Sequence, residues 1–212
     1  MNWWIIAALV AGAYLLGSIP SAVWIGKIFY GVDVRTLGSG NAGTTNVARV
    51  LGKRAAIPVF LIDTLKGFAA VELACLSGIE SDTPAIYYLK MVLCAAAVLG
   101  HMFPLFAGFR GGKGVATLVG AMFGFSVGAI LLCLLTFLII VYVTHYVSVG
   151  SMVGGCMLPL FAAVCGQRDW RLICFYILVA LIIVINHRKN IDRLLKGTEN
   201  KSYFFKADRP KQ

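Results

Sequence analysis

The chain has 212 residues, of which 59% are hydrophobic and 13% are charged. Its mean hydropathy of +0.84 leaves too little polar surface to cover a water-soluble globule of this size, so a soluble domain is excluded. The net charge of +10 comes from cations concentrated between apolar stretches, which indicates membrane topology rather than nucleic-acid binding. We therefore expect one all-α polytopic membrane domain, residues 1–212.

Membrane-spanning helices need about 20 apolar residues each. The N-terminal stretch lacks the basic start and cleavage site of a secretory signal, so it is expected to remain as the first span. The segment 115–145 would be about 46 Å long as one helix, more than a hydrocarbon core of about 30 Å, and its glycines at 124 and 128 predict a break. Seven spans are predicted, with approximate ranges 3–28, 55–77, 85–104, 114–124, 128–145, 149–166 and 170–187.

The charged residues predict the orientation of these spans. Segment 27–54 holds five Lys or Arg residues against one Asp, and the tail from residue 188 holds eight against three acidic residues. Since cytoplasmic segments are rich in Lys and Arg, both should face the cytoplasm, which requires an odd number of spans. The N-terminus is then outside, and the polar segments 29–54, 105–114, 145–149 and 188–212 share the cytoplasmic face.

The first cytoplasmic segment contains GSGNAG at residues 38–43, which matches the dinucleotide-binding pattern G-x-G-x-x-G. That pattern requires a preceding strand, whereas membrane spans flank this segment, so a dinucleotide site is excluded. Glycine-rich backbone can instead direct several N–H groups at one anion, although a tight polar loop is the plainer alternative. The candidate phosphate donors are Ser39, Gly40, Asn41, Thr44, Thr45 and Asn46.

Polar side chains within the apolar stretches are expected to be mainly structural. Asp63 and Lys66 lie three residues apart in the second span, so they can form an ion pair on one helix face. The six cysteines lack the paired spacings of a zinc site or a disulfide framework. No metal site is predicted.

The segment FRGGKGVAT at 109–117 joins two cations to a glycine-rich turn before an apolar helix. It is not a Walker A motif, because Gly114 follows Lys113 where Ser or Thr is required, so no nucleotide site is predicted. Flexible backbone and a helix N-terminus favour a phosphate. A positive-inside loop would explain the cations but not the glycines. The candidate phosphate ligands are Arg110, Gly111, Gly112, Lys113 and Gly114.

Two histidines lie near the inner ends of predicted spans. A polar ring at His101 is costly there without a partner, so it is either a satisfied structural histidine or part of the phosphate site. His145 is interpreted as interfacial, and Ser148 nearby is a further candidate phosphate ligand.

The last polar segment contains a literal H-x-x-x-x-D, His187 to Asp192, which is the signature of the large thioester-dependent acyltransferase superfamily. On one helix these two residues point about 140° apart and cannot face one substrate together. His187 and Asn190 can, because they are three residues apart. Glu199 could close the loop against them, and a basic tail attracted to anionic lipid is the alternative.

Three motifs together are highly specific: GSGNAGTTNVARVLGK (38–53), GHMFPLFAGFRGGKGVAT (100–117) and HRKNIDRLLKGTENK (187–201). With them the chain resembles, nearly end to end, the bacterial integral-membrane acyl-phosphate:glycerol-3-phosphate acyltransferases. The resemblance implies a seven-span fold and transfer of a fatty acyl group from acyl phosphate to the sn-1 hydroxyl of glycerol 3-phosphate. The products would be lysophosphatidic acid and phosphate, in the first acylation of phospholipid synthesis.

The resemblance also assigns roles to residues. It implies catalytic roles for Ser39 and Arg49, a glycerol-phosphate-binding loop at Gly111–Gly114 and a more structural role for Glu199. The implied catalytic histidines and amide are His101, His187 and Asn190. No cofactor, metal, nucleic acid or obligate protein partner is implied, and the enzyme would act at the cytoplasmic face of the bacterial inner membrane.

The acceptor of the hydroxyl proton stays open between a histidine and a substrate phosphate oxygen. Neutral imidazole is available near pH 7, but the many nearby cations oppose forming an imidazolium, which favours the phosphate. The alternative function is a membrane transporter or channel for an organic phosphate, since broken spans and glycine-flanked cations also suit a solute path.

Overall fold

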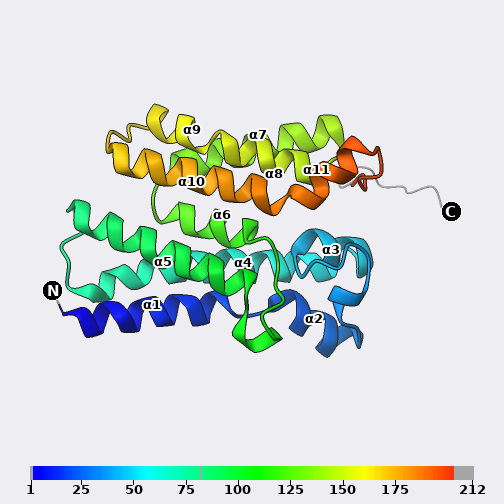
Figure 1. Ribbon diagram of the computed structural model, residues 1–212, viewed down its shortest axis with the longest axis horizontal. Helices are drawn as coiled ribbons and strands as arrows, with labels where there is room; N and C mark the ends of the chain where they lie inside the picture. Colours follow the sequence, from blue (N-terminus) through cyan, green and yellow to red (C-terminus); the bar gives the residue numbers. More distant parts are fainter. Residues whose placement is uncertain (1, 82, 203–212) are drawn as a thin grey trace. The chain divides into compact units, whose positions relative to one another are not determined.

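The computed structural model describes residues 2–81 and 83–202, which contain helices and loops and no β-strand. The all-α class predicted from composition is therefore confirmed for the described residues. The chain divides into two compact units, Met1–Val127 and Gly128–Gln212. Figure 1 labels the helices of both units.

The described residues of unit 1 form six α-helices and three short 3₁₀ turns. The first predicted span is interrupted at residues 18–20, because Pro20 has no N–H to continue the hydrogen-bond ladder. The helices are α1 (Trp3–Gly17), α2 (Ser21–Tyr30), α3 (Thr44–Val50), α4 (Lys53–Glu72), α5 (Pro84–Met102) and α6 (Val115–Phe123), with η1 (Val34–Thr36), η2 (Leu73–Ser77) and η3 (Leu105–Ala107).

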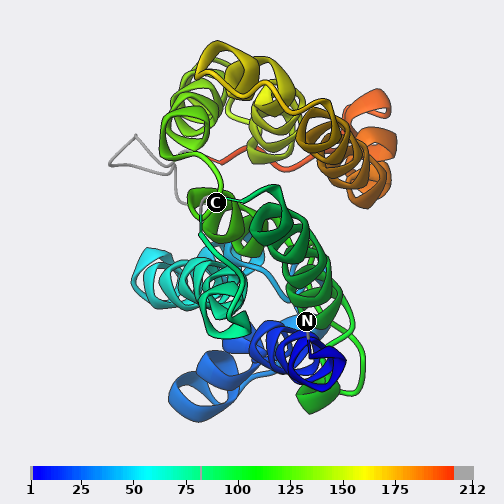
Figure 2. The ribbon, with the colours of Figure 1, turned by 90° about the vertical axis from the view of Figure 1, so that its left-hand side faces the viewer.

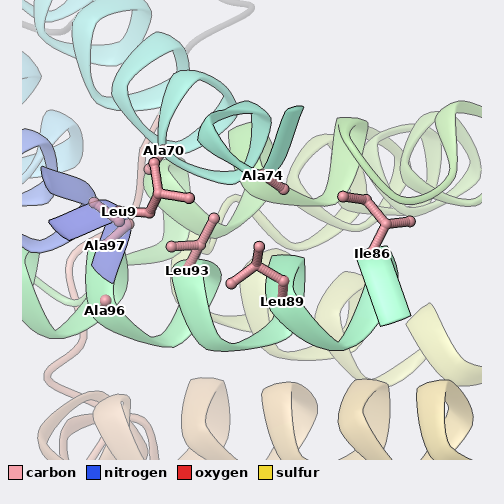
Figure 3. Close-up of a cluster of buried hydrophobic side chains, with 9 residues drawn as sticks. Leu9, Ala70, Ala74, Ile86, Leu89, Leu93, Ala96 and Ala97 are labelled. Carbon is pink, nitrogen blue, oxygen red and sulfur yellow. The ribbon is translucent and has the colours of Figure 1, made fainter. Parts of the chain in front are cut away.

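The core of unit 1 forms where α5 packs against α1, α4 and η2. Ile86, Leu89 and Leu93 recur at intervals of three and four residues, so they share one face of α5. Figure 3 shows these side chains directed at Ala70 and Ala74. Figure 2 views the same helices along their length. Small residues at the contact let the backbones approach closely, which is how membrane helices gain packing energy without a hydrophobic driving force.

Helix α6 has nine residues, about 14 Å at the α-helical rise, so by itself it covers about half of a hydrocarbon core of about 30 Å, and the short span expected at 114–124 stays a prediction. It lies against α4, where a Cβ at Gly67 or Gly120 would collide with the backbone of the other helix. Its C-terminal end is held by Lys90, whose Nζ donates to the Gly124 carbonyl (3.0 Å) and to Glu72 Oε1 (2.8 Å). The short helix is therefore anchored on its neighbours in unit 1.

Up to Ser202, where the described part of unit 2 ends, the chain forms five helices, and α10 packs on α8 and α9. The axis bends by 44° between α8 and α9, where Pro159 stands in the first turn of α9, and by 55° between α10 and α11. The helices are α7 (Val127–Thr144), α8 (Val147–Cys156), α9 (Leu158–Val164), α10 (Trp170–Asn186) and α11 (Arg188–Leu195).

Within the described residues, three segments are long and apolar enough to cross a membrane: Trp3–Tyr30, Pro84–Ala107 and Val127–Thr144. The number rises to five if each bent pair of unit 2 is one span. Helix α4 falls outside this set because it carries charged side chains along its length, and α6 because it is short. The seven-span count and the orientation stay predictions, and the basic residues after Ser202 lie outside the described part of the chain.

Candidate active site

The first motif folds around the side chain of Asn46, near the start of α3. Asn46 is 2% exposed, and its Nδ2 donates to the carbonyls of Val34 (2.8 Å) and Leu37 (3.0 Å). Its Oδ1 accepts from the backbone N–H (2.8 Å) and the hydroxyl (3.1 Å) of Ser39. A buried amide needs such partners for all its polar atoms. Asn46, a predicted phosphate ligand, here holds the loop that carries Ser39.

Arg49 lies one turn after Asn46 on α3. Its Nη1 is 3.4 Å from Asn46 Oδ1, the same oxygen that accepts from Ser39. The structure thus brings together the two first-motif residues that the resemblance marks as catalytic. Both are oriented by one buried amide.

The glycine loop of the second motif is bonded to the end of α5. Gly111 N–H donates to the Met102 carbonyl (3.1 Å), and Gly112 N–H donates to the His101 carbonyl (3.2 Å). These carbonyls belong to the last turn of α5, where no later N–H group of the helix is available to bond to them. The two glycines, predicted phosphate ligands, therefore use their N–H groups to cap α5.

Lys113 and Gly114 follow, directly before the first turn of α6. Gly114 is the N-cap of α6. Its φ of +80° is a backbone conformation that residues other than glycine rarely adopt. The first N–H groups of a helix have no helical acceptor and carry positive partial charge. Lys113 thus directly precedes the N-cap of α6 in the chain, and a cation beside a helix N-terminus is suited to binding phosphate.

Arg35 connects the first motif segment to the second. Its Nη1 donates to the carbonyls of Ala107 (2.7 Å) and Arg110 (3.3 Å), while Nε and Nη2 hold the Asp33 carboxylate at 2.9 and 2.7 Å. The hydrogen bonds from Arg35 outweigh partial burial and lower the pKa of Asp33 well below its ordinary value. From the sequence, Arg35 was only one of the cations used to predict membrane orientation. The one sequence feature that could have indicated its role is the carboxylate of Asp33, two residues earlier.

Asp63 is the shared acceptor of a buried polar cluster between α2, α4 and α5. Its Oδ1 accepts from Lys66 Nζ (2.7 Å) and from the Ser21 hydroxyl (2.8 Å), and Lys66 also donates to the Ile19 carbonyl (2.7 Å). Asp63 and Lys66 are almost fully buried, which is tolerated because each charge has a partner. The ion pair expected from the i,i+3 spacing is present.

His101 lies between this cluster and the glycine loop. Its Nδ1 is 3.1 Å from Thr117 Oγ1 and 3.6 Å from Asp63 Oδ1. A small cavity lies beside it, and its lining includes Asp63, Ala42 and Gly112. Residues of the first and second motifs thus meet at one small cavity.

In unit 2 the Glu199 carboxylate gathers three side chains. It accepts from Ser148 Oγ (2.8 Å), Asn190 Nδ2 (2.6 Å) and Arg193 Nε (2.6 Å). Burial raises the pKa of Glu199, but the hydrogen bonds from Asn190, Arg193 and Ser148 outweigh it, so the pKa is lowered. Ser148, a predicted phosphate ligand, is here a partner of Glu199, and Asn190 is oriented by the same carboxylate.

His187 stands at the junction of α10 and α11 and is 3% exposed. Its Nδ1–H donates to the Ile183 carbonyl (2.8 Å), so a neutral ring carries its lone pair on Nε2. The side chain of Asp192, in contrast to that of His187, is 58% exposed and forms an ion pair with Lys196 at 2.9 Å. The two residues of the literal H-x-x-x-x-D are therefore in separate environments.

Comparison with known proteins places this geometry in a family. Residues 7–197 match the family model described as Glycerol-3-phosphate acyltransferase. The chain belongs to this family. A glycerol-3-phosphate acyltransferase of Clostridioides difficile (strain 630) is 47% identical over 203 residues, which cover 93% of this chain and 95% of the relative.

Solved structures of the family show the same fold. A crystal structure of PlsY (YgiH), an integral membrane glycerol 3-phosphate acyltransferase, in its glycerol 3-phosphate form has a TM-score of 0.83 and 41% identity, covering 92% of this chain and 94% of that chain. The lysphosphatidic acid form of PlsY has a TM-score of 0.81 with the same identity and coverage. The family and the enzyme class predicted from the three motifs are confirmed, as is the integral-membrane character predicted from composition. The acyltransferase function that the motifs imply is confirmed with them.

No group of three or more His, Cys, Asp or Glu residues in the described ranges could hold a metal ion. The donors and cations of Ser39, Arg49 and Lys113 are groups that bind oxyanions such as phosphate.

Proposed function

We propose that the protein transfers a fatty acyl group from acyl phosphate to the sn-1 hydroxyl of glycerol 3-phosphate at the cytoplasmic face of the bacterial inner membrane. The observation that carries this proposal is the 41% identity, over nearly the whole chain, to an enzyme crystallised in a glycerol 3-phosphate form and a lysphosphatidic acid form. The match to residues 7–197 includes parts of both units, which supports treating them as one acyltransferase domain.

The reaction forms a bond between the sn-1 oxygen and the acyl carbonyl carbon and breaks the bond from that carbon to the phosphate oxygen. Phosphate leaves, and the hydroxyl proton passes to a phosphate oxygen of a substrate. Cations crowd the polar segments, and they favour phosphate over imidazole as the proton acceptor. Acyl phosphate is already activated, so the enzyme must mainly position two reactants and stabilise charge.

The residues divide this work by their positions. Ser39 and Arg49 of the first motif, both oriented by Asn46, contact an oxyanion of a substrate. Lys113 and the first turn of α6 bind the phosphate of glycerol 3-phosphate. The resemblance gives His187 and Asn190 catalytic roles, and within unit 2 Glu199 fixes the amide of Asn190.

A donor comparison tests the activity. Purified protein in detergent is incubated with labelled glycerol 3-phosphate and a long-chain acyl phosphate, acyl-CoA or acyl carrier protein. We expect labelled lysophosphatidic acid with acyl phosphate alone. Product from a thioester only would overturn the proposed donor, and no product from any donor, with labelled glycerol 3-phosphate crossing sealed vesicles, would favour the transporter.

Seven spans and an outside N-terminus belong to the same proposal. The test uses Ser39→Cys, Lys113→Cys and Lys189→Cys, an exposed position of the third motif, each in a variant without the native cysteines, and an impermeant thiol reagent applied to right-side-out and inverted vesicles. We expect reaction in inverted vesicles for all three. Reaction of any one from the outside would contradict a shared cytoplasmic face.

A further inference from the structure

Asp63 lies outside all three motifs, yet its carboxylate borders the cavity beside the glycine loop. It is 1% exposed, and its Oδ1 alone accepts from both Ser21 and Lys66. Its second oxygen, Oδ2, is buried and has no hydrogen-bond partner in the described part of the chain. Burying a carboxylate oxygen without a partner is costly, and a structural ion pair alone does not require it.

His101 is the neighbour of Asp63 that links the buried carboxylate to the glycine loop. Its Nδ1 faces Asp63 Oδ1 at 3.6 Å and Thr117 Oγ1 at 3.1 Å. A carboxylate on this side favours the tautomer with the proton on Nδ1, because the N–H dipole then points at the negative charge. Asp63 and Thr117 together define which way the imidazole faces.

The far edge of the same ring lies against the glycine loop. A Cβ added at Gly112 would collide with His101 Nε2 and would lie 3.0 Å from the Ala42 carbonyl. The backbone is tied there as well, since Gly112 N–H donates to the His101 carbonyl at 3.2 Å. The imidazole therefore spans from the buried carboxylate to the residue directly before Lys113.

We propose that Asp63 is a positioning residue for the acyl transfer: it orients His101, and His101 holds the glycine loop against the first motif. This rests on the proposed function, in which Lys113 and the start of α6 bind glycerol 3-phosphate. A ring that turns away from Gly112 loosens the loop that binds this substrate. The effect of losing Asp63 therefore falls on KM for glycerol 3-phosphate more than on kcat.

The test measures both constants for Asp63→Asn, His101→Gln and the double variant. We expect Asp63→Asn to raise KM for glycerol 3-phosphate about tenfold, a size ordinary for one charged contact, with a smaller change in kcat. Because Asp63 acts through His101, the double variant should be no worse than His101→Gln alone. Single effects that multiply in the double variant, or a wild-type KM in folded Asp63→Asn, overturn the proposal.

Two further variants keep the test independent of folding. Asp63→Asn leaves the Lys66 charge buried, so Asp63→Asn with Lys66→Met removes both charges together. Thr117→Val takes the other partner from His101 Nδ1 without changing any charge. Both should raise KM for glycerol 3-phosphate, and a wild-type KM in both overturns the proposal.

Glu72→Gln is the matched control, because Glu72 lies on α4 as Asp63 does and pairs with Lys90. It should lower thermal stability and leave KM unchanged. An equal rise of KM in this control would show a general effect of breaking an ion pair on α4 and overturn the positioning role. Failure of the proposed function is distinct, since the wild-type protein would then form no lysophosphatidic acid.

Discussion

Ser39 donates both its backbone N–H and its hydroxyl to the side-chain oxygen of Asn46, at 2.8 and 3.1 Å. The two residues bracket the glycine-rich turn of the first motif. The position of the Ser39 hydroxyl is thus set by a buried amide seven residues away. Changes at Asn46 should reach the reaction without touching either substrate.

Asn46→Asp should lower kcat/KM for lysophosphatidic acid formation about a hundredfold. The carboxylate loses both Nδ2 donors and faces the Val34 and Leu37 carbonyls, and each buried acceptor left unpaired costs about 1–3 kcal/mol. Asn2→Asp is the matched control, because Asn2 is the exposed N-cap of α1 and Asp caps helices equally well. Activity of Asn46→Asp within about twofold of wild type would contradict the role of this amide.

Arg35→Lys should lower kcat/KM about tenfold, although the charge is kept. A lysine ammonium cannot hold the Asp33 carboxylate with two nitrogens and still reach the Ala107 carbonyl, so the two loops of unit 1 lose their connection. Steady-state kinetics measure this effect. Arg168→Lys, at an exposed residue between α9 and α10, is the control and should be silent. Equal activity of the two variants would show that the loops do not depend on Arg35.

Lys90→Met should lower Tm by about 3–8 °C and leave KM for glycerol 3-phosphate unchanged. The change leaves Glu72 without its cation and the Gly124 carbonyl at the end of α6 without its donor. Thermal unfolding in detergent measures the loss. Adding Glu72→Gln should recover part of it, because the uncompensated charge is then removed. An unchanged Tm would rule out this anchor of α6.

Glu199→Gln should be less stable than wild type at pH 7, by about 2–4 °C in Tm. Because the folded-state pKa of Glu199 is below its ordinary value of 4.5, the ionised carboxylate favours the folded state. Its contribution is complete above pH 4.5 and is lost as the pH falls through the lower folded-state pKa. The Tm difference from wild type should therefore shrink on acidification. Glu80→Gln, at an exposed loop residue, is the control and should leave Tm at pH 7 unchanged, and a Tm difference for Glu199→Gln that stays constant on acidification would contradict this role of Glu199.

Asp192→Asn should leave turnover within about twofold of wild type. Asp192 is exposed and pairs with Lys196, whereas His187 is buried and donates to a carbonyl of its own helix. A rate assay on the folded variant measures this. Loss of turnover would mean that His187 and Asp192 act as a pair after all.

Features that depend on residue spacing along one helix could be predicted from the amino-acid sequence. Apolar length predicted where helices lie and that residues 115–145 break after a short first piece, as α6 and α7 do. A separation of three residues predicted the Asp63–Lys66 ion pair, and a separation of five predicted that His187 and Asp192 do not act together. The three motifs identified the family.

The pairing of polar groups that lie on different segments could not be predicted, because it depends on how the helices and loops pack. The glycine N–H groups at 111 and 112 and the amide of Asn46 are chemically able to bind phosphate, but α5 and the first loop supply nearer acceptors. Arg35 and Thr117 gain their importance from the Ala107 carbonyl and from His101, neither of which is near them in sequence. A donor pairs with whatever acceptor packing brings within about 3 Å, and residue spacing carries no information about that distance once the two lie on different helices.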